Sequence, residues 1–191
     1  ALKTAEGKPL DITLTTNGSL LALKAEALKN AGLKRVTVSL DGLDDAVFKR
    51  MNDVDFPVSD VLEGIAAAQA AGLGPIKVNM VVKRGTNDHE ILPMARHFQG
   101  SGVVLRFIEF MDVGNHNHWN PGLVVSGEEI LARLATATAF EALPPSHFGE
   151  VANRFHYLDD GSEFGVITSI SSPFCRNCTR ARLSADGRLF T

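Results

Sequence analysis

The chain has 191 residues, 45% of them hydrophobic and 21% charged, and this balance excludes a disordered tail. A net charge of -3 and a sequence pI near 6.1 give no general attraction to nucleic acid or to a membrane. The sequence holds no apolar run as long as a membrane span and no signal segment. The two cysteines, Cys175 and Cys178, are too close together for a disulfide framework, which favours a reducing, cytoplasmic setting.

The chain opens with an expected strand over residues 11–16, which ends at Asn17-Gly18. Ser19 is expected to cap the helix that follows. The apolar spacing of that helix predicts a buried face made of Leu20, Leu23, Ala27, Leu28 and Ala31.

The same strand-then-helix unit recurs up to Met111. Strands are expected over 35–40, 76–82 and 103–111, and helices over 44–51, over 59–71 and around Ile91, Met94, Ala95 and Phe98. Strands that alternate with helices pair in parallel through right-handed crossovers. This pattern fits a doubly wound sheet or an arc of a β/α barrel, and it does not separate the two. In both, ligands bind where the strands end.

The character of the chain changes after Met111. A polar loop over 112–122 precedes a helix that begins near Ser126. Two hairpins are expected after it, with arms at 153–157 and 164–170 and at 182–184 and 189–190. We therefore expect residues 1–112 to form part of a barrel and residues 113–191 to form a lateral, largely antiparallel region.

Polar residues stand at the expected strand ends. Thr15 lies at the end of the first strand, Ser39 and Asp41 at the end of the second, and Met111 after the fourth. These positions suit ligand contacts, but Thr, Ser and Asp also cap helices and form turns.

Polar residues also interrupt the apolar strands. Lys77 and Asn79 are two residues apart and so project to the same face. A buried charge must be paired or must face a polar cavity. Arg106 and Glu109 could form a structural ion pair, although their odd spacing sends them to opposite faces. Lys77 is better explained as a ligand for an anion.

The segment from Ser172 to Arg182 carries the strongest local signal. Cys175 and Cys178 can bind one metal or one cluster, and the spacing fits half of a zinc site, a redox pair or part of an iron–sulfur site. Arg180 and Arg182 point the same way from a strand and suit phosphate oxygens. His116 and His118 lack a supporting ligand nearby in the sequence and are interpreted as polar loop residues.

Taken together, the runs Leu14 to Gly18, Val38 to Asp41, Lys77 to Asn79, Arg106 to Asp112 and Phe174 to Leu183 resemble the MoaA family. These are radical S-adenosylmethionine lyases that cyclise GTP in molybdenum cofactor (molybdopterin) biosynthesis. The resemblance implies an incomplete, TIM-like β/α barrel of the radical SAM type with two 4Fe–4S clusters. One cluster cleaves S-adenosylmethionine to a radical, and the other binds the guanine of GTP.

The resemblance also implies roles for individual residues. Cys175 and Cys178 would be two of the three ligands of the substrate-side cluster. Ser39 and Met111 would contact S-adenosylmethionine. GTP, the implied substrate, would be contacted by Thr15, Lys77, Arg180, Ala181 and Arg182. No catalytic side chain is assigned. A homodimer is compatible with the family, and the product would pass to the next enzyme of the pathway.

Two departures from the family pattern stand out. The three-cysteine motif that generates the radical and the third ligand of the second cluster are both missing from the sequence. We therefore expect the chain to be a fragment of the enzyme and to be inactive on its own. The rival interpretations are another radical SAM enzyme with an auxiliary cluster and a zinc-stabilised binding module.

Overall fold

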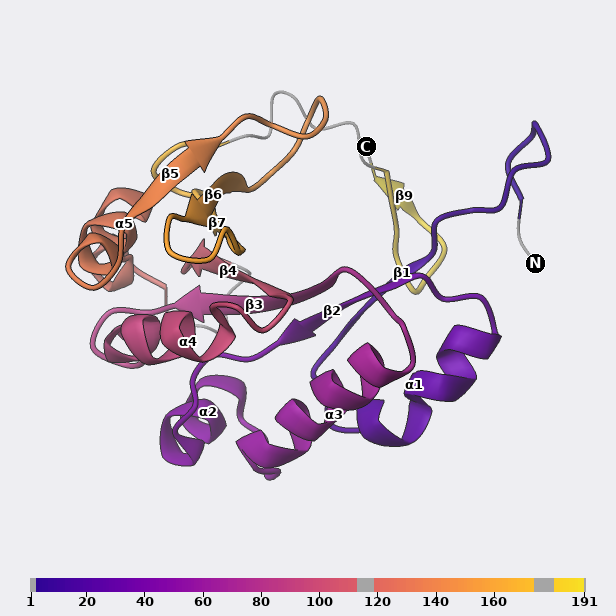
Figure 1. Ribbon diagram of the computed structural model, residues 1–191, viewed down its shortest axis with the longest axis horizontal. Helices are drawn as coiled ribbons and strands as arrows, with labels where there is room; N and C mark the ends of the chain where they lie inside the picture. The colour runs from indigo at the N-terminus through magenta and orange to yellow at the C-terminus, as the bar shows by residue number, and fades with distance from the viewer. Residues whose placement is uncertain (1–2, 113–118, 174–180, 191) are drawn as a thin grey trace.

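The computed structural model describes residues 3–112, 119–173 and 181–190, which form one curved sheet with helices on its outer side and a separate small hairpin (Figure 1). The main sheet contains β1 (Thr13–Thr16), β2 (Arg35–Ser39), β3 (Ile76–Val82), β4 (Val103–Glu109), β5 (Phe140–Leu143), β6 (Asn153–Tyr157) and β7 (Glu163–Ile167). The α-helices are α1 (Leu21–Asn30), α2 (Asp45–Asn52), α3 (Val58–Ala70), α4 (Ile91–Phe98) and α5 (Gly127–Ala135). Two short 3-10 helices, η1 (Asp88–Glu90) and η2 (Pro121–Leu123), and the hairpin of β8 (Arg182–Leu183) and β9 (Leu189–Phe190) complete the described elements.

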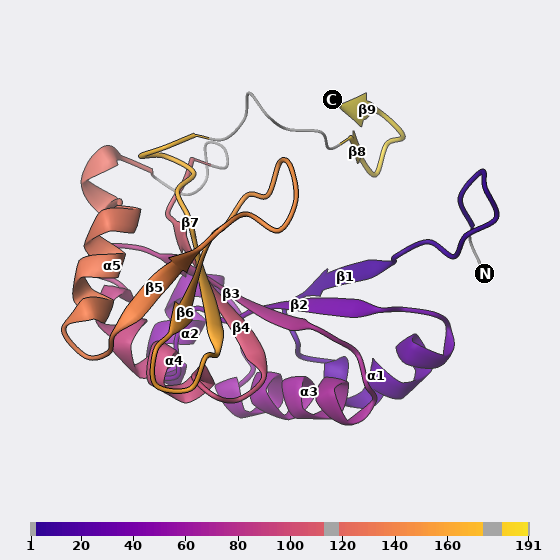
Figure 2. The ribbon, with the colours of Figure 1, turned by 45° about the horizontal axis from the view of Figure 1, so that its top comes forward.

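The sheet has the strand order β1-β2-β3-β4-β7-β6-β5 and does not close. β1 to β4 pair in parallel in chain order, as the sequence predicts. Figure 2 shows α1 to α4 on one side of the strands, which is compatible with an incomplete barrel. The fold class expected from the sequence therefore holds as a mixed α/β sheet compatible with a partial barrel.

The strands that follow residue 112 continue this sheet. β5 and β6 pair antiparallel, as do β6 and β7, so the expected hairpin around residues 159–161 is present. β7, however, pairs in parallel with β4, with Leu105 opposite Phe164 and Ile108 opposite Ile167. Because β7 lies beside β4, these strands extend the curved sheet.

One face of the sheet is apolar and packs against the helices. In β2 to β4 every second residue is fully or almost fully buried, as in Val36, Val38, Val78, Met80, Leu105 and Phe107. A strand side chain alternates between faces with a period of two, so these residues all point to the helix side. They form the centre of the hydrophobic core together with α1, α3 and α4. The residues between them in the same strands therefore point to the opposite face of the sheet, away from the helices.

The start of α1 differs from the sequence prediction. The helix begins at Leu21 after Leu20, without a side-chain cap, and Ser19 Oγ instead donates to Asn17 Oδ1 at 3.0 Å. The buried face is also different, because Leu21 and Ala25 are buried while Leu20 and Leu23 are 59% and 79% exposed. Apolar residues occur all around this helix, so their spacing does not specify one face.

Other helix starts agree with the sequence. α5 begins after Ser126, whose side chain accepts a hydrogen bond from the Glu129 backbone N–H at 3.2 Å. α2 is capped in the same way by Asp44, which accepts from Val47 N at 2.9 Å. Across the described ranges, no helix combines the length and the hydropathy that crossing a bilayer requires.

Candidate functional site

The face of the sheet that the helices leave uncovered carries several polar side chains. The strand register places Thr15, Thr37 and Lys77 side by side across β1, β2 and β3. Two residues further along the strands, Ser39 lies beside Asn79, which lies beside Arg106. We call this surface the open face. It is the concave side of the curved sheet in Figure 2.

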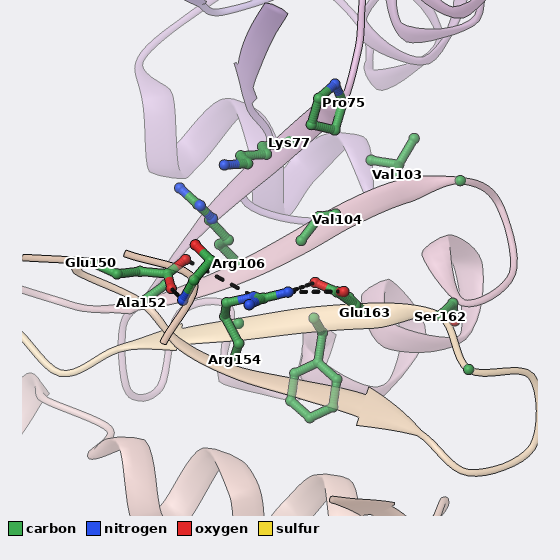
Figure 3. Close-up of a pocket in the computed structure, with 15 residues that line it drawn as sticks. Pro75, Lys77, Val103, Val104, Arg106, Glu150, Ala152, Arg154, Ser162 and Glu163 are labelled. Carbon is green, nitrogen blue, oxygen red and sulfur yellow. Dashed lines mark hydrogen bonds and ion pairs between the residues drawn. The ribbon is translucent and has the colours of Figure 1, made fainter. Parts of the chain in front are cut away.

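A cavity of about 450 Å³ lies on the open face, over the first halves of β3, β4 and β7. The loop between β5 and β6 and the start of β6 form its other wall. Figure 3 shows Lys77 and Arg106 reaching into this space from neighbouring strands, with Glu150, Arg154 and Glu163 across from them. The cavity thus gathers three cationic and two anionic side chains.

Lys77 and Arg106 are the two cations that remain available in the cavity. Neither side chain forms a hydrogen bond or an ion pair with any residue in the described part of the chain. Partial burial lowers the pKa of Lys77, and the nearby charge of Arg106 lowers it further. Burial likewise lowers the pKa of Arg106, against the opposing effect of Glu150. Two adjacent, partly desolvated cations without partners form a site suited to an anion.

The third cation, Arg154, is already engaged. Its guanidinium donates to both carboxylate oxygens of Glu163, at 3.0 and 2.9 Å, and to the carbonyl of Pro144 at 3.3 Å. The carboxylate of Glu150, whose side chain is 8% exposed, lies 3.9 Å from Arg154 Nε and accepts from Ser146 N at 2.6 Å. These contacts tie the β5–β6 loop to β6 and β7. Arg154 and Glu150 therefore build the cavity wall.

Arg106 and Glu109 do not form the ion pair that the sequence left open. They lie on opposite faces of β4, as their spacing predicts. Glu109 is fully buried and accepts hydrogen bonds from Gly127 N at 2.7 Å, Ile170 N at 2.7 Å and Ser171 N at 2.8 Å. Burial alone would raise the pKa of Glu109, but these bonds and one from the Ser171 hydroxyl outweigh it and hold the pKa below its ordinary value. Glu109 thus joins the end of β4 to the start of α5 and to the turn after β7.

The carboxyl ends of the strands carry the other predicted positions. Thr15 is exposed on β1, and Ser39 is half-buried as the last residue of β2. Just beyond it, Asp41 is buried and accepts from Val81 N at 2.7 Å, and burial raises the pKa of Asp41 to about 6. Met111 follows β4 and is 39% exposed. All four lie at or near one edge of the sheet, as parallel strands require.

Comparison with known proteins shows the family to which the chain belongs. Residues 1–98 match the model of the Radical SAM superfamily, which is about half of the chain. The chain belongs to this superfamily. Residues 103–191 match a second model, described as Molybdenum Cofactor Synthesis C.

Several curated relatives of this radical SAM chain carry one name, GTP 3',8-cyclase. The protein from Acidothermus cellulolyticus is 55% identical over 95% of this chain and 50% of its own length. The protein from Xanthomonas axonopodis pv. citri is 49% identical over 95% of this chain and 54% of its own. The relative from Staphylococcus carnosus is 44% identical over the whole chain and 55% of its own. The chain spans about half the length of the curated relatives it matches.

A solved structure supports the fold. A radical SAM methyltransferase from Sphaerobacter thermophilus aligns with 63% of this chain and 35% of its own, with a TM-score of 0.51 and 19% sequence identity. At this identity the likeness extends to the fold alone.

Part of the predicted site lies outside the described residues of the radical SAM chain. Cys175, Cys178 and Arg180 fall there, as do His116 and His118. Ala181 is exposed, and the backbone of Arg182 pairs with Phe190 in the β8–β9 hairpin. Over the described ranges, no three His, Cys, Asp or Glu side chains group as metal ligands. The convergence of Lys77 with Arg180 and Arg182 beside the thiols stays a prediction.

Sequence reasoning did not single out the cavity wall. Arg154 and Glu163 are contributed by the two arms of the β6–β7 hairpin, and the register places each diagonally across from the other. Because the sequence predicted that hairpin, the opposite charges of Arg154 and Glu163 on its two arms could have predicted their ion pair. Glu150 lies in a loop, and its position depends on contacts that no local pattern records.

Proposed function

We propose that this radical SAM protein is a GTP 3',8-cyclase of molybdenum cofactor biosynthesis, a lyase that rearranges GTP by radical chemistry. The observation that carries the proposal is the pair of partnerless cations, Lys77 and Arg106, in a cavity on the open face of the sheet. The name shared by relatives at 44–55% identity supports the same reaction.

Lys77 and Arg106 would bind the phosphates of GTP. An arginine fork contacts two phosphate oxygens at once, while lysine acts as a compact point charge. Both side chains are already partly desolvated, so a polyanion would restore the interactions that burial removed from them. Arg154 would keep the wall in place through Glu163 and would not need to contact the ligand.

The remaining substrate contacts stay as the sequence predicted them. Thr15 shares a row of the open face with Lys77 through Thr37 and would contact the nucleotide from β1. Arg180, Ala181 and Arg182 would line the other end of the GTP site. Ser39 and Met111, both near the carboxyl edge of the strands, would contact S-adenosylmethionine.

The donor chemistry of the cysteine segment fits an iron–sulfur cluster. Cys175 and Cys178 offer two thiolates at a spacing that lets both bind one iron–sulfur cluster. A 4Fe–4S cluster supplies one-electron chemistry or an open iron site for a ligand when it is bound. The protein's own contribution is to hold the nucleotide so that a sugar carbon faces the radical source, with water excluded by the walls of the barrel.

The two rival functions give the cavity no role. A peptide-modifying radical SAM enzyme has no evident use for partnerless cations on the open face, and a zinc-stabilised binding module would leave them unexplained. A homodimer, a cytoplasmic location and transfer of the product to the next enzyme of the pathway complete the proposal.

Calorimetric titration of GTP into the anaerobically reconstituted full-length protein tests the proposal. Lys77→Ala and Arg106→Ala should each weaken GTP binding about 10- to 100-fold, because each removes a charged hydrogen-bond donor. Arg180→Ala and Arg182→Ala should also weaken it, with the iron content unchanged. Arg84→Ala, which removes an exposed arginine that pairs with Glu129, is the matched control and should bind GTP as the wild type does. Unaltered GTP affinity in all four site variants would refute the proposal.

A further inference from the structure

The side chain of Asn79, on the open face, carries a buried polar atom that nothing in the described structure satisfies. Asn79 lies in the middle of β3, and its Oδ1 atom is buried without a hydrogen-bond partner. Ser39 and Arg106 flank Asn79 on the neighbouring strands, but neither donates to it. Leaving a buried acceptor unpaired is costly, so such an atom in a ligand-binding face calls for an explanation.

The chemistry of this atom differs from that of the cations beside it. Lys77 and Arg106 can only donate, and they suit phosphate oxygens, which only accept. Asn79 Oδ1 can only accept, so its partner must bring an N–H or O–H group, which ionised phosphate oxygens lack. Lys77 and Asn79 therefore address two chemically different parts of one ligand.

The strand geometry says which part. Asn79 is two residues after Lys77 on the same face, which is about 6.6 Å closer to the carboxyl edge of the sheet. The cavity that holds Lys77 and Arg106 lies on the same face but toward the amino ends of the strands, over their first halves. In a nucleotide whose phosphates occupy that cavity, the sugar is the next group along the strands toward Asn79. The sugar carries hydroxyl groups.

We propose that Asn79 binds a ribose hydroxyl of the nucleotide and so fixes the sugar relative to the phosphates held by Lys77 and Arg106. This inference rests on the proposed function for the identity of the ligand as a ribonucleotide. In that reaction the sugar is the reacting group, so Asn79 is a positioning residue that sets which sugar hydrogen faces the radical source. The site takes a donor-bearing sugar and gives no advantage to a bare polyphosphate.

Titration of three kinds of ligand into the full-length protein tests the assignment: GTP, its 2'-deoxy and 3'-deoxy analogues, and inorganic triphosphate. Asn79→Leu, which has nearly the same shape without the amide, should weaken GTP binding roughly 5- to 10-fold. It should leave triphosphate binding unchanged. The wild type should bind one of the deoxy analogues more weakly than GTP, and the variant should no longer distinguish that analogue from GTP. Asn79→Ala is a second variant should leucine prove too bulky.

The controls separate a ligand contact from a structural role. Asn153→Leu replaces an exposed asparagine in β6 and should change none of these affinities. Asn79→Leu should unfold at the same temperature as the wild type or higher, since it removes an unpaired buried acceptor. An equal loss of GTP and triphosphate, an unchanged affinity for GTP, weakened binding of S-adenosylmethionine alone, or a lowered unfolding temperature would each overturn the inference. A wild type that binds neither GTP nor triphosphate would instead refute the proposed function.

Discussion

The two faces of the central strands follow opposite rules. Toward the helices, β2, β3 and β4 present fully buried apolar side chains such as Val38, Met80 and Phe107. Toward the open face, the same strands present Ser39, Asn79 and Arg106, and none of these side chains has a hydrogen-bond or ion-pair partner among the described residues. The covered face thus provides stability, and the open face provides the groups for ligand binding. Because side chains alternate between the faces, the position of a residue along its strand decides on which face it lies.

The strongest test of this division uses two neighbours on β4. Phe107→Ala should lower the free energy of unfolding by about 3–5 kcal/mol, because Phe107 is fully buried and alanine leaves a cavity. Ile108→Ala, one residue later on the open face, should cost clearly less, since Ile108 is only half-buried. Urea unfolding of both variants measures the difference. Equal costs would mean that the open face is packed as tightly as the covered one.

Glu109 is the exception on the covered face, and it offers the next largest effect. Its carboxylate accepts bonds from Gly127, Ile170 and Ser171, so Glu109→Gln should lower the free energy of unfolding by about 2 kcal/mol at neutral pH. Glu128→Gln, an exposed change in the first turn of α5, is the control and should stay within about 0.5 kcal/mol. Denaturant unfolding that cannot distinguish the two variants would show that the Glu109 contacts contribute little.

A smaller effect concerns pH. The folded-state pKa of Asp41 is raised to about 6, above its unfolded value of 3.8, so between these values the folded state binds more protons. Stability should therefore increase by about 1 kcal/mol as the pH falls from 7 to 5. Asp41→Asn should remove this increase. Glu109, whose pKa is lowered, titrates below this window and loses its contribution only at more acidic pH. A wild type and variant with parallel pH profiles would contradict the raised pKa.

Much of this division could be read from the sequence. The spacing of Lys77 and Asn79 predicted that both project to one face of β3, and the odd spacing of Arg106 and Glu109 predicted their separation onto opposite faces. Lys77 stood out because a charge inside an apolar strand needs a partner or a cavity. These inferences are local, since each depends on a repeat of two residues within a single strand.

The features that the sequence did not predict depend on contacts between distant residues or lie in segments without a clear periodic pattern of apolar residues. The pairing of β7 with β4 joins residues about 60 positions apart, and no turn signal records it. The buried face of α1 was assigned to Leu20 and Leu23 instead of Leu21 and Ala25 because apolar residues surround that helix. The role of Glu150 as part of the cavity wall depends on a loop whose shape follows from its own hydrogen bonds to Ser146.

The smallest effect on stability should come from the residue with the clearest predicted role in binding. Lys77→Met keeps the length of the side chain and removes a partly desolvated charge that pairs with nothing in the described structure. Its free energy of unfolding should therefore stay within about 0.5 kcal/mol of the wild type or rise. Lys24→Met on the exposed side of α1 is the control for the loss of one charge. A loss above about 1 kcal/mol in Lys77→Met alone would mean that the open face also holds the sheet together, because only a stabilising contact of Lys77 could produce it.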